Sequence, residues 1–74
     1  MVKEYKHDEG KFEVIQDENN VTVNPTEKEG LITVSKNQSK DSLIQEIEDK
    51  LITMYEGTPL LVKEFVIWLQ ETIK

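Results

Sequence analysis

The chain has no cysteine and, at 74 residues, little material from which to build a core. A domain of this length buries only about 60% of the surface that its unfolded chain exposes. Without cysteine, neither a disulfide nor a thiolate metal site can supplement that thin core. The stability of the fold must therefore come from packing within the chain, from a partner chain, or from both.

Arginine is absent as well, and only nine lysines accompany fifteen carboxylates, which gives a net charge of −6. Proteins that bind nucleic acid directly gather Arg and Lys on one surface. Here the lysines are scattered among acidic residues along the whole sequence. The composition therefore argues against direct nucleic-acid binding.

Long hydrophobic runs are also lacking. The longest, residues 60–62 and 65–69, are separated by Lys63 and Glu64, and both fall far short of the roughly 20 residues that span a bilayer. The N-terminus begins in polar sequence, without an apolar stretch of the signal-peptide type. We expect a cytoplasmic protein with no membrane association.

The sequence has no recognisable catalytic or metal-binding pattern. His7, the only histidine, is followed by Asp8 and Glu9, but no second cluster could complete a zinc site, so a solvated turn is the better interpretation. Residues 17–20 lack the spacing of an EF-hand and are typical of a hairpin turn. The three glycines cannot form a phosphate-binding loop, and no serine lies near the histidine in sequence. We expect no cofactor, no metal and no enzymatic activity.

The first half of the chain has the pattern of an antiparallel β-meander. Apolar residues alternate with polar ones at period two in the clearest segments, and Asp, Asn, Pro and Gly residues lie between the segments. The expected strands are residues 2–7, 11–16, 20–24 and 31–35. Residues 31–34 have apolar side chains at both odd and even positions, which indicates a central strand or a strand whose outer face meets something else.

After about residue 40 the apolar residues recur at helical spacing. We expect a first helix that begins near residues 39–42, with Ser42 and Gln45 as a capping box, and that ends at Gly57. Thr58 as N-cap and Pro59 at the first helical position predict that a second helix starts at once. One apolar stripe on the first helix and a broader apolar band on the second would then cover one sheet face. The stripe is Leu43, Ile44, Ile47, Leu51, Met54 and Tyr55, and the band is Leu61, Val62, Phe65, Val66, Trp68, Leu69 and Ile73.

The predicted architecture is therefore a single α+β domain over residues 1–74. A sheet of three or four strands occupies about residues 2–36, and a helical hairpin occupies about residues 40–74.

Three apolar residues fall outside the helical stripes: Leu60, Ile67 and Ile52. Together with Trp68 at the edge of the second band, they form a candidate partner-binding surface. Self-association into a homo-oligomer is the simplest use of this surface, and another protein partner is the alternative. Two other interpretations are that the domain itself covers these side chains, or that they are scattered exposed apolar residues of the usual kind.

The outer side of the first helix carries a row of acidic residues, Asp41, Asp49 and Glu56, flanked by Glu46 and Glu48. Such a row resembles a line of phosphates, so the chain could act as a phage-type acidic inhibitor that mimics nucleic acid. A face of this kind is more often simply solvated and keeps a protein soluble.

Tyr55, Glu56 and Gly57 lie between the two expected helices, and Val62, Phe65, Val66 and Leu69 follow them. In these features residues 39–73 resemble the end of PqqD-like peptide-recognition domains, which guide precursor peptides to modifying enzymes. That resemblance implies a winged helix that binds an extended peptide as an added edge strand. It also implies a further helix that starts near residues 24–26. In this chain, however, the segment that follows contains the β-branched run of Ile32, Thr33 and Val34, which indicates a strand instead.

Overall fold

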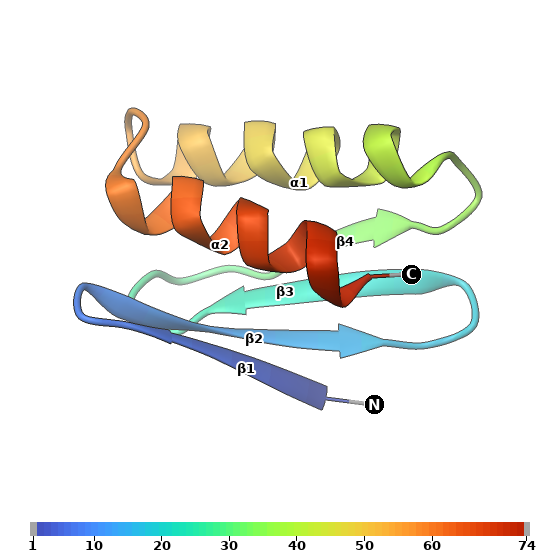
Figure 1. Cartoon of the computed structure of the whole chain (residues 1–74), viewed down its shortest axis with the longest axis horizontal. Coiled ribbons are helices and arrows are strands. Elements are labelled where there is room, and N and C mark those ends of the chain that lie inside the picture. Colours follow the sequence, from blue (N-terminus) through green and yellow to red (C-terminus); the bar gives the residue numbers. More distant parts are fainter. Residues whose placement is uncertain (1, 74) are drawn as a thin grey trace.

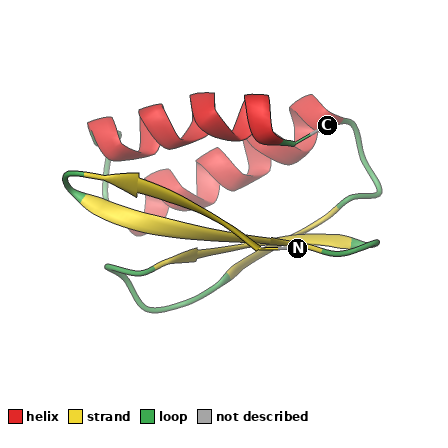
Figure 2. Ribbon diagram, turned by 60° about the horizontal axis from the view of Figure 1, so that its bottom comes forward, coloured by secondary structure: helices red, strands yellow, loops and turns green. Residues whose placement is uncertain are grey.

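The computed structural model describes residues 2–73, which form a four-stranded antiparallel sheet followed by two helices (Figure 1). The strands are β1 (Val2–His7), β2 (Gly10–Gln16), β3 (Asn20–Pro25) and β4 (Ile32–Ser35), and the helices are α1 (Lys40–Met54) and α2 (Leu60–Thr72). The two helices form a layer over one face of the sheet, and the other face is open (Figure 2). The predicted α+β meander with a helical hairpin is confirmed.

The strands lie in chain order, each paired with the next, because the turns between them are short. The register places Val14 opposite Val23, and Val23 opposite Ile32, so that the period-two apolar residues line up on one face. The turn between β2 and β3 is held by Asp17, whose Oδ1 accepts hydrogen bonds from the backbone N–H groups of Asn19 and Asn20 at 2.8 and 2.7 Å. These two bonds to the ionised form lower the pKa of Asp17.

The order corrects one expectation about the fourth segment. β4 begins at Ile32 and is an edge strand, not a central one. Leu31 lies before it and is 64% exposed, while Ile32 and Val34 are buried. Leu31 falls outside the strand pairing. The apolar residues at both odd and even positions of this segment therefore do not indicate a strand that is buried on both faces.

The start of α1 is also corrected. Its N-cap is Ser39 rather than Ser42, because the Ser39 side chain accepts a hydrogen bond from the backbone N–H of Ser42 at 3.1 Å. Ser42 therefore lies inside the first turn, where its hydroxyl donates to Gln38 Oε1 instead. The helix ends at Met54, before the expected Gly57, and Glu56 and Gly57 then turn the chain with positive φ angles of 55° and 147°.

α2 begins one residue later than expected. Pro59 is its N-cap, with an extended backbone and no side-chain hydrogen bond, and Leu60 is its first residue. Thr58 is therefore not the cap. The Pro59 carbonyl accepts from the backbone N–H groups of Val62 and Lys63, so the first turn is closed by backbone atoms alone.

The core lies between the sheet and the helix layer, and all five aromatic residues of the chain form one cluster within it. The ring of Phe65 on α2 is at the centre, stacked on Phe12 of β2 with centroids 4.2 Å apart. Tyr5 and Trp68 pack on its other side, and Tyr55 meets Phe12 edge to face. The part of the core under α1 is aliphatic. Its buried members there are Leu43, Ile44, Ile47 and Leu51 with Ile32 and Val34 of β4.

Candidate partner-binding surface

Two of the four expected surface residues project from α2 into solvent. Leu60 is 57% exposed and Ile67 is 60% exposed. They are seven residues apart, so they lie on almost the same line of the helix, opposite the buried Leu61, Phe65 and Leu69. We call Leu60, Ile67 and the adjoining Trp68 the α2 surface.

The other two residues are only partly exposed. Trp68 packs on the core edge, with its ring centroid 5.3 Å from Tyr5 and 5.7 Å from Phe65. Ile52 also packs against the core cluster, and at about 100° per residue it lies on the same side of α1 as Ile44 and Glu48, the side that faces α2. Ile52 therefore belongs to the seam between the helices more than to an outer surface.

The acidic residues of α1 are not one uniform row. Asp41 and Asp49 are exposed, but Glu46 is half-buried and Glu56 lies beyond the end of the helix. Glu46 pairs with Lys50 at 3.2 Å, which neutralises part of the charge. Glu46 and Glu56 therefore do not extend the acidic face that Asp41 and Asp49 form on α1.

His7 contacts Glu64 of α2, a pairing that the sequence alone did not indicate. The turn itself is Asp8 and Glu9, as expected, but His7 ends β1 with only 11% of its side chain exposed. Its Nε2 lies 2.7 Å from Glu64 of α2, and its Nδ1 accepts the backbone N–H of Glu9 at 3.1 Å. The solvated-turn interpretation is wrong for His7, whose side chain ties the sheet to α2.

β1 is held from one side and open on the other. Beneath α2, Tyr5 contacts Phe65 and Trp68, and partial burial together with the Glu64 charge raises the pKa of Tyr5.

The backbone hydrogen bonds of β2 show which groups of β1 are free. The odd-numbered residues of β2 form backbone hydrogen bonds with β3, because the Lys11 carbonyl accepts from the Thr26 N–H and the Asp17 N–H donates to the Asn20 carbonyl. In an antiparallel sheet, alternate residues of a strand form hydrogen bonds with opposite neighbours, so the even-numbered residues of β2 bond to β1. Their partners in β1 are Lys3, Tyr5 and His7. The backbone groups of Val2, Glu4 and Lys6 therefore point away from the sheet.

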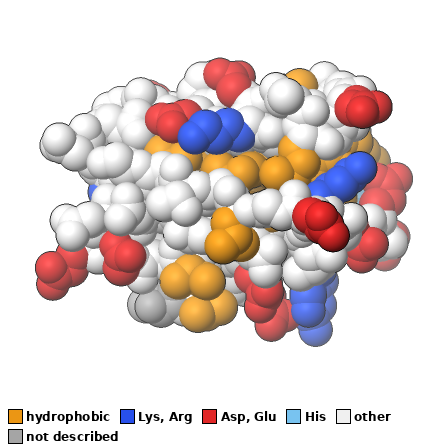
Figure 3. All heavy atoms as spheres, turned by 180° about the vertical axis from the view of Figure 1, so that it is seen from behind, with side chains coloured by type: hydrophobic (Ala, Val, Ile, Leu, Met, Phe, Trp, Pro, Cys, Tyr) orange, Lys and Arg blue, Asp and Glu red, His pale blue; other side chains and the backbone are white. Residues whose placement is uncertain are grey.

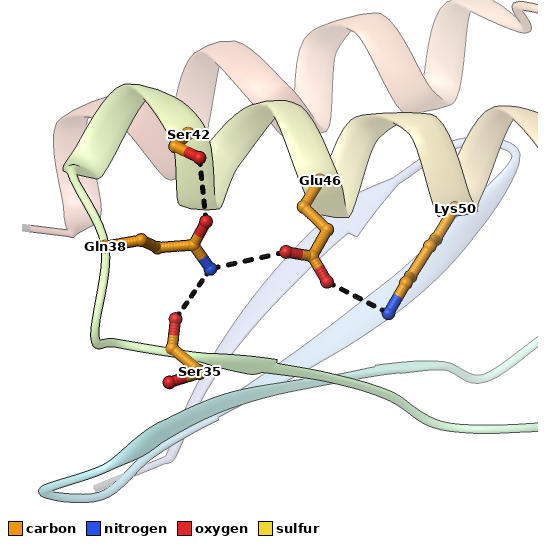
Figure 4. Close-up of polar contacts among 5 residues, drawn as sticks. All are labelled: Ser35, Gln38, Ser42, Glu46 and Lys50. Carbon is orange, nitrogen blue, oxygen red and sulfur yellow. Dashed lines mark hydrogen bonds and ion pairs between the residues drawn. The ribbon is translucent and has the colours of Figure 1, made fainter.

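The other edge, β4, is partly capped by the side chain of Gln38 (Figure 4). Lys36 N–H donates to Asn19, so Ser35 and Thr33 are the residues whose backbone points outward. The side-chain amide of Gln38 donates to the Ser35 carbonyl at 2.8 Å and to Glu46 at 3.3 Å, and Glu46 in turn pairs with Lys50. Hydrogen bonds from Lys50 and Gln38 lower the pKa of Glu46. Seen from behind, this side of the molecule carries a band of hydrophobic atoms bordered by charged side chains (Figure 3).

A wide surface depression of about 700 Å³ lies at the β1–β2 turn, lined in part by His7, Glu9 and Thr26. Within the described range, no group of three His, Asp or Glu side chains is placed to hold a metal ion. None of the helices in that range is long and apolar enough to cross a bilayer.

Neither a protein-family model, nor a curated protein, nor a solved structure matches the chain. The resemblance to PqqD-like domains is limited to α1 and α2, because β3 and β4 occupy the segment where those domains have a further helix.

Proposed function

We propose that this protein acts by binding another protein chain through the α2 surface, and that it is not an enzyme. One observation carries the proposal: Leu60 and Ile67 are both more than half exposed on a helix whose other side is entirely core. Full burial of an aliphatic side chain of this size stabilises by roughly 1.5–3 kcal/mol. A partner that covers both residues would therefore gain an appreciable part of its binding energy from them.

The position of the surface also favours recognition. α2 is fixed at three points, by Phe65 in the aromatic cluster, by the Glu64–His7 contact and by Lys40, whose ammonium donates to the Gln70 carbonyl. A rigid helix loses little conformational entropy when it binds. Trp68 follows Ile67 in the sequence and is only partly buried at the edge of the core, and a partly exposed Trp is typical of interface anchors.

The test compares Ile67→Glu with Leu31→Glu. Both replace a side chain that is about equally exposed, but Leu31 lies before β4 and away from the α2 surface. We expect both variants to unfold at the wild-type urea concentration, and only Ile67→Glu to weaken association, by about tenfold or more. Light scattering over a concentration series measures self-association, and quantitative affinity capture measures binding of other proteins. The proposal fails if the wild type is monomeric at high concentration and Ile67→Glu captures the same proteins with the same affinity.

A second candidate is a peptide-recognition module, which the open edge of β1 favours, because an extended peptide could add to it as a fifth strand. The affinity experiment separates this case, since peptide binding would be insensitive to Ile67→Glu. Partner binding that weakens steeply with salt and requires Asp41 and Asp49 would instead indicate acidic mimicry.

A further inference from the structure

We infer that the partner is a second copy of this chain, joined edge to edge through β1 so that two sheets become one eight-stranded antiparallel sheet. This inference rests on the proposed function, protein binding at α2, and names its partner. It is drawn from the open edge of β1, from the order of charges along that edge, and from the position of α2 above it.

The edge is ready to pair because β1 is already a fixed strand. Tyr5 and His7 hold its inner face to α2, and the whole of β1 is in register with β2. The outward N–H and C=O groups of Glu4 and Lys6 then form a template for another strand. At the opposite edge, Gln38 occupies the Ser35 carbonyl, so the β4 edge offers fewer free groups over a shorter strand.

The charges on β1 choose the partner and the register. Only residues with outward backbone groups can form the hydrogen-bonded pairs of a two-fold antiparallel junction. Centring the junction on Glu4 would place two glutamates opposite each other, and centring it on Lys6 would do the same with two lysines. Centring it on Tyr5 places each Glu4, which pairs with Lys11 at 3.8 Å within its own copy, opposite the partner's Lys6, so that two opposite-charge pairs are added. Of these three registers, only the one centred on Tyr5 brings opposite charges together.

The helix-facing side of β1 supports the same register. Centring on Tyr5 brings Lys3, which is exposed, opposite the partner's His7, the residue that contacts Glu64. Lys3, the lysine on the helix-facing side of β1, therefore lies near the Glu64 carboxylate of the other copy. The two Tyr5 rings form the central pair, next to Trp68 of each copy.

In one copy, α2 contacts β1 and α1 contacts β4 (Figure 1). The two α2 helices of a joined sheet would therefore be neighbours on the same face of that sheet. Trp68, which packs beside Tyr5 at the edge of the core, would lie close to the junction.

The test uses two charge reversals, Glu4→Lys and Lys6→Glu. Each alone places like charges opposite each other twice per dimer, and we expect the dimer dissociation constant to rise about tenfold or more, measured by sedimentation equilibrium. An equimolar mixture of the two variants restores both opposite-charge pairs, so the mixture should form a heterodimer with near wild-type affinity. The double variant Glu4→Lys, Lys6→Glu should also dimerise. Asp49→Lys, a charge reversal at an exposed position of α1, the helix that contacts β4, is the control and should leave the dimer intact.

A second measurement reads the junction directly. In the monomer, the amide hydrogens of Glu4 and Lys6 point to solvent, so we expect them to exchange rapidly in dilute solution and at least tenfold more slowly where the dimer predominates. A dimer in which these two amides stay unprotected, or one unaffected by both single reversals, overturns the inference. So does a protein that remains monomeric at millimolar concentration. If Ile67→Glu still abolishes binding of a different protein in that last case, the proposed function survives while this inference fails. Binding of an extended peptide by the monomer at β1 also overturns it.

Discussion

The two edges of the sheet differ in how their backbone groups are treated. β4 is four residues long, and the side chain of Gln38 caps its last outward carbonyl. β1 is six residues long, and nothing in residues 2–73 caps the outward groups of Glu4 and Lys6. Proteins usually shorten or block a sheet edge that must not pair. This chain caps one carbonyl of the shorter edge and leaves the longer edge open, which is consistent with a use for the open edge.

The core beneath the two edges differs in the same direction. β4 and α1 are joined by aliphatic residues, whereas β1 and α2 are joined by the aromatic cluster and by the His7–Glu64 contact. Aromatic side chains bury large areas, so the α2 half is expected to hold its geometry firmly beside the open edge. Both edges therefore rest on packing, aliphatic beneath β4 and aromatic beneath β1, and each adds a polar contact, from Gln38 at β4 and from His7 at β1.

The largest effect is expected from Phe65→Ala, which removes the central ring of the aromatic cluster. Loss of a fully buried Phe costs about 3–5 kcal/mol of unfolding free energy, enough to leave a domain this small largely unfolded. Val34→Ala, the matched change beneath β4, should cost only about 2 kcal/mol, because it removes fewer buried atoms. Urea denaturation followed by circular dichroism measures both values. Equal losses would show that the two halves of the core do not differ in strength.

A smaller effect is expected from Gln38→Ala, which uncaps β4. The variant loses the hydrogen bonds to the Ser35 carbonyl, the Ser42 hydroxyl and Glu46, with a net cost of about 1 kcal/mol. Hydrogen exchange should become faster in β4 while β1 is unchanged. Gln45→Ala removes another glutamine that bonds only to the exposed side chains of Glu48 and Asp49, and its cost should stay below about 0.5 kcal/mol. An unchanged exchange rate in β4 would mean that Gln38 does not protect that edge.

The sequence predicted the parts of this fold that depend on periodicity. The alternation of Phe12, Val14, Val21 and Val23 identified the inner face, and the helical stripe from Leu43 to Leu51 identified the buried side of α1. Prediction failed at the ends of elements, where competing caps lie within a few residues. Ser39 and Ser42 both fit a cap, and only the backbone geometry selects Ser39.

The surface was predicted only in part. Leu60 and Ile67 were correctly placed outside the helical band, because their angular position depends on α2 alone. Ile52 is only partly exposed, because it packs against the core cluster, and this environment depends on how α2 packs against α1. The free edge of β1 and the contact between His7 and Glu64 depend on strand order and on pairs distant in sequence, for which one sequence without an aligned family provides no signal.

The smallest expected effect is a pH dependence at the capped edge, through Glu46. Its pKa in the folded protein is lowered below the ordinary value of 4.5, chiefly by the hydrogen bond from Lys50 and then by that from Gln38. A lowered folded-state pKa adds stability above the unfolded-state pKa, and this stability is lost as the pH falls through the folded-state value. The wild type should therefore be slightly more stable than Glu46→Gln at pH 7, and the difference should shrink as the pH falls below 4.5 and vanish once the pH is below the folded-state pKa of Glu46. Urea denaturation at several pH values measures it. In a Lys50→Met background the difference at pH 7 should shrink, and an undiminished difference there would remove Lys50 as the main cause.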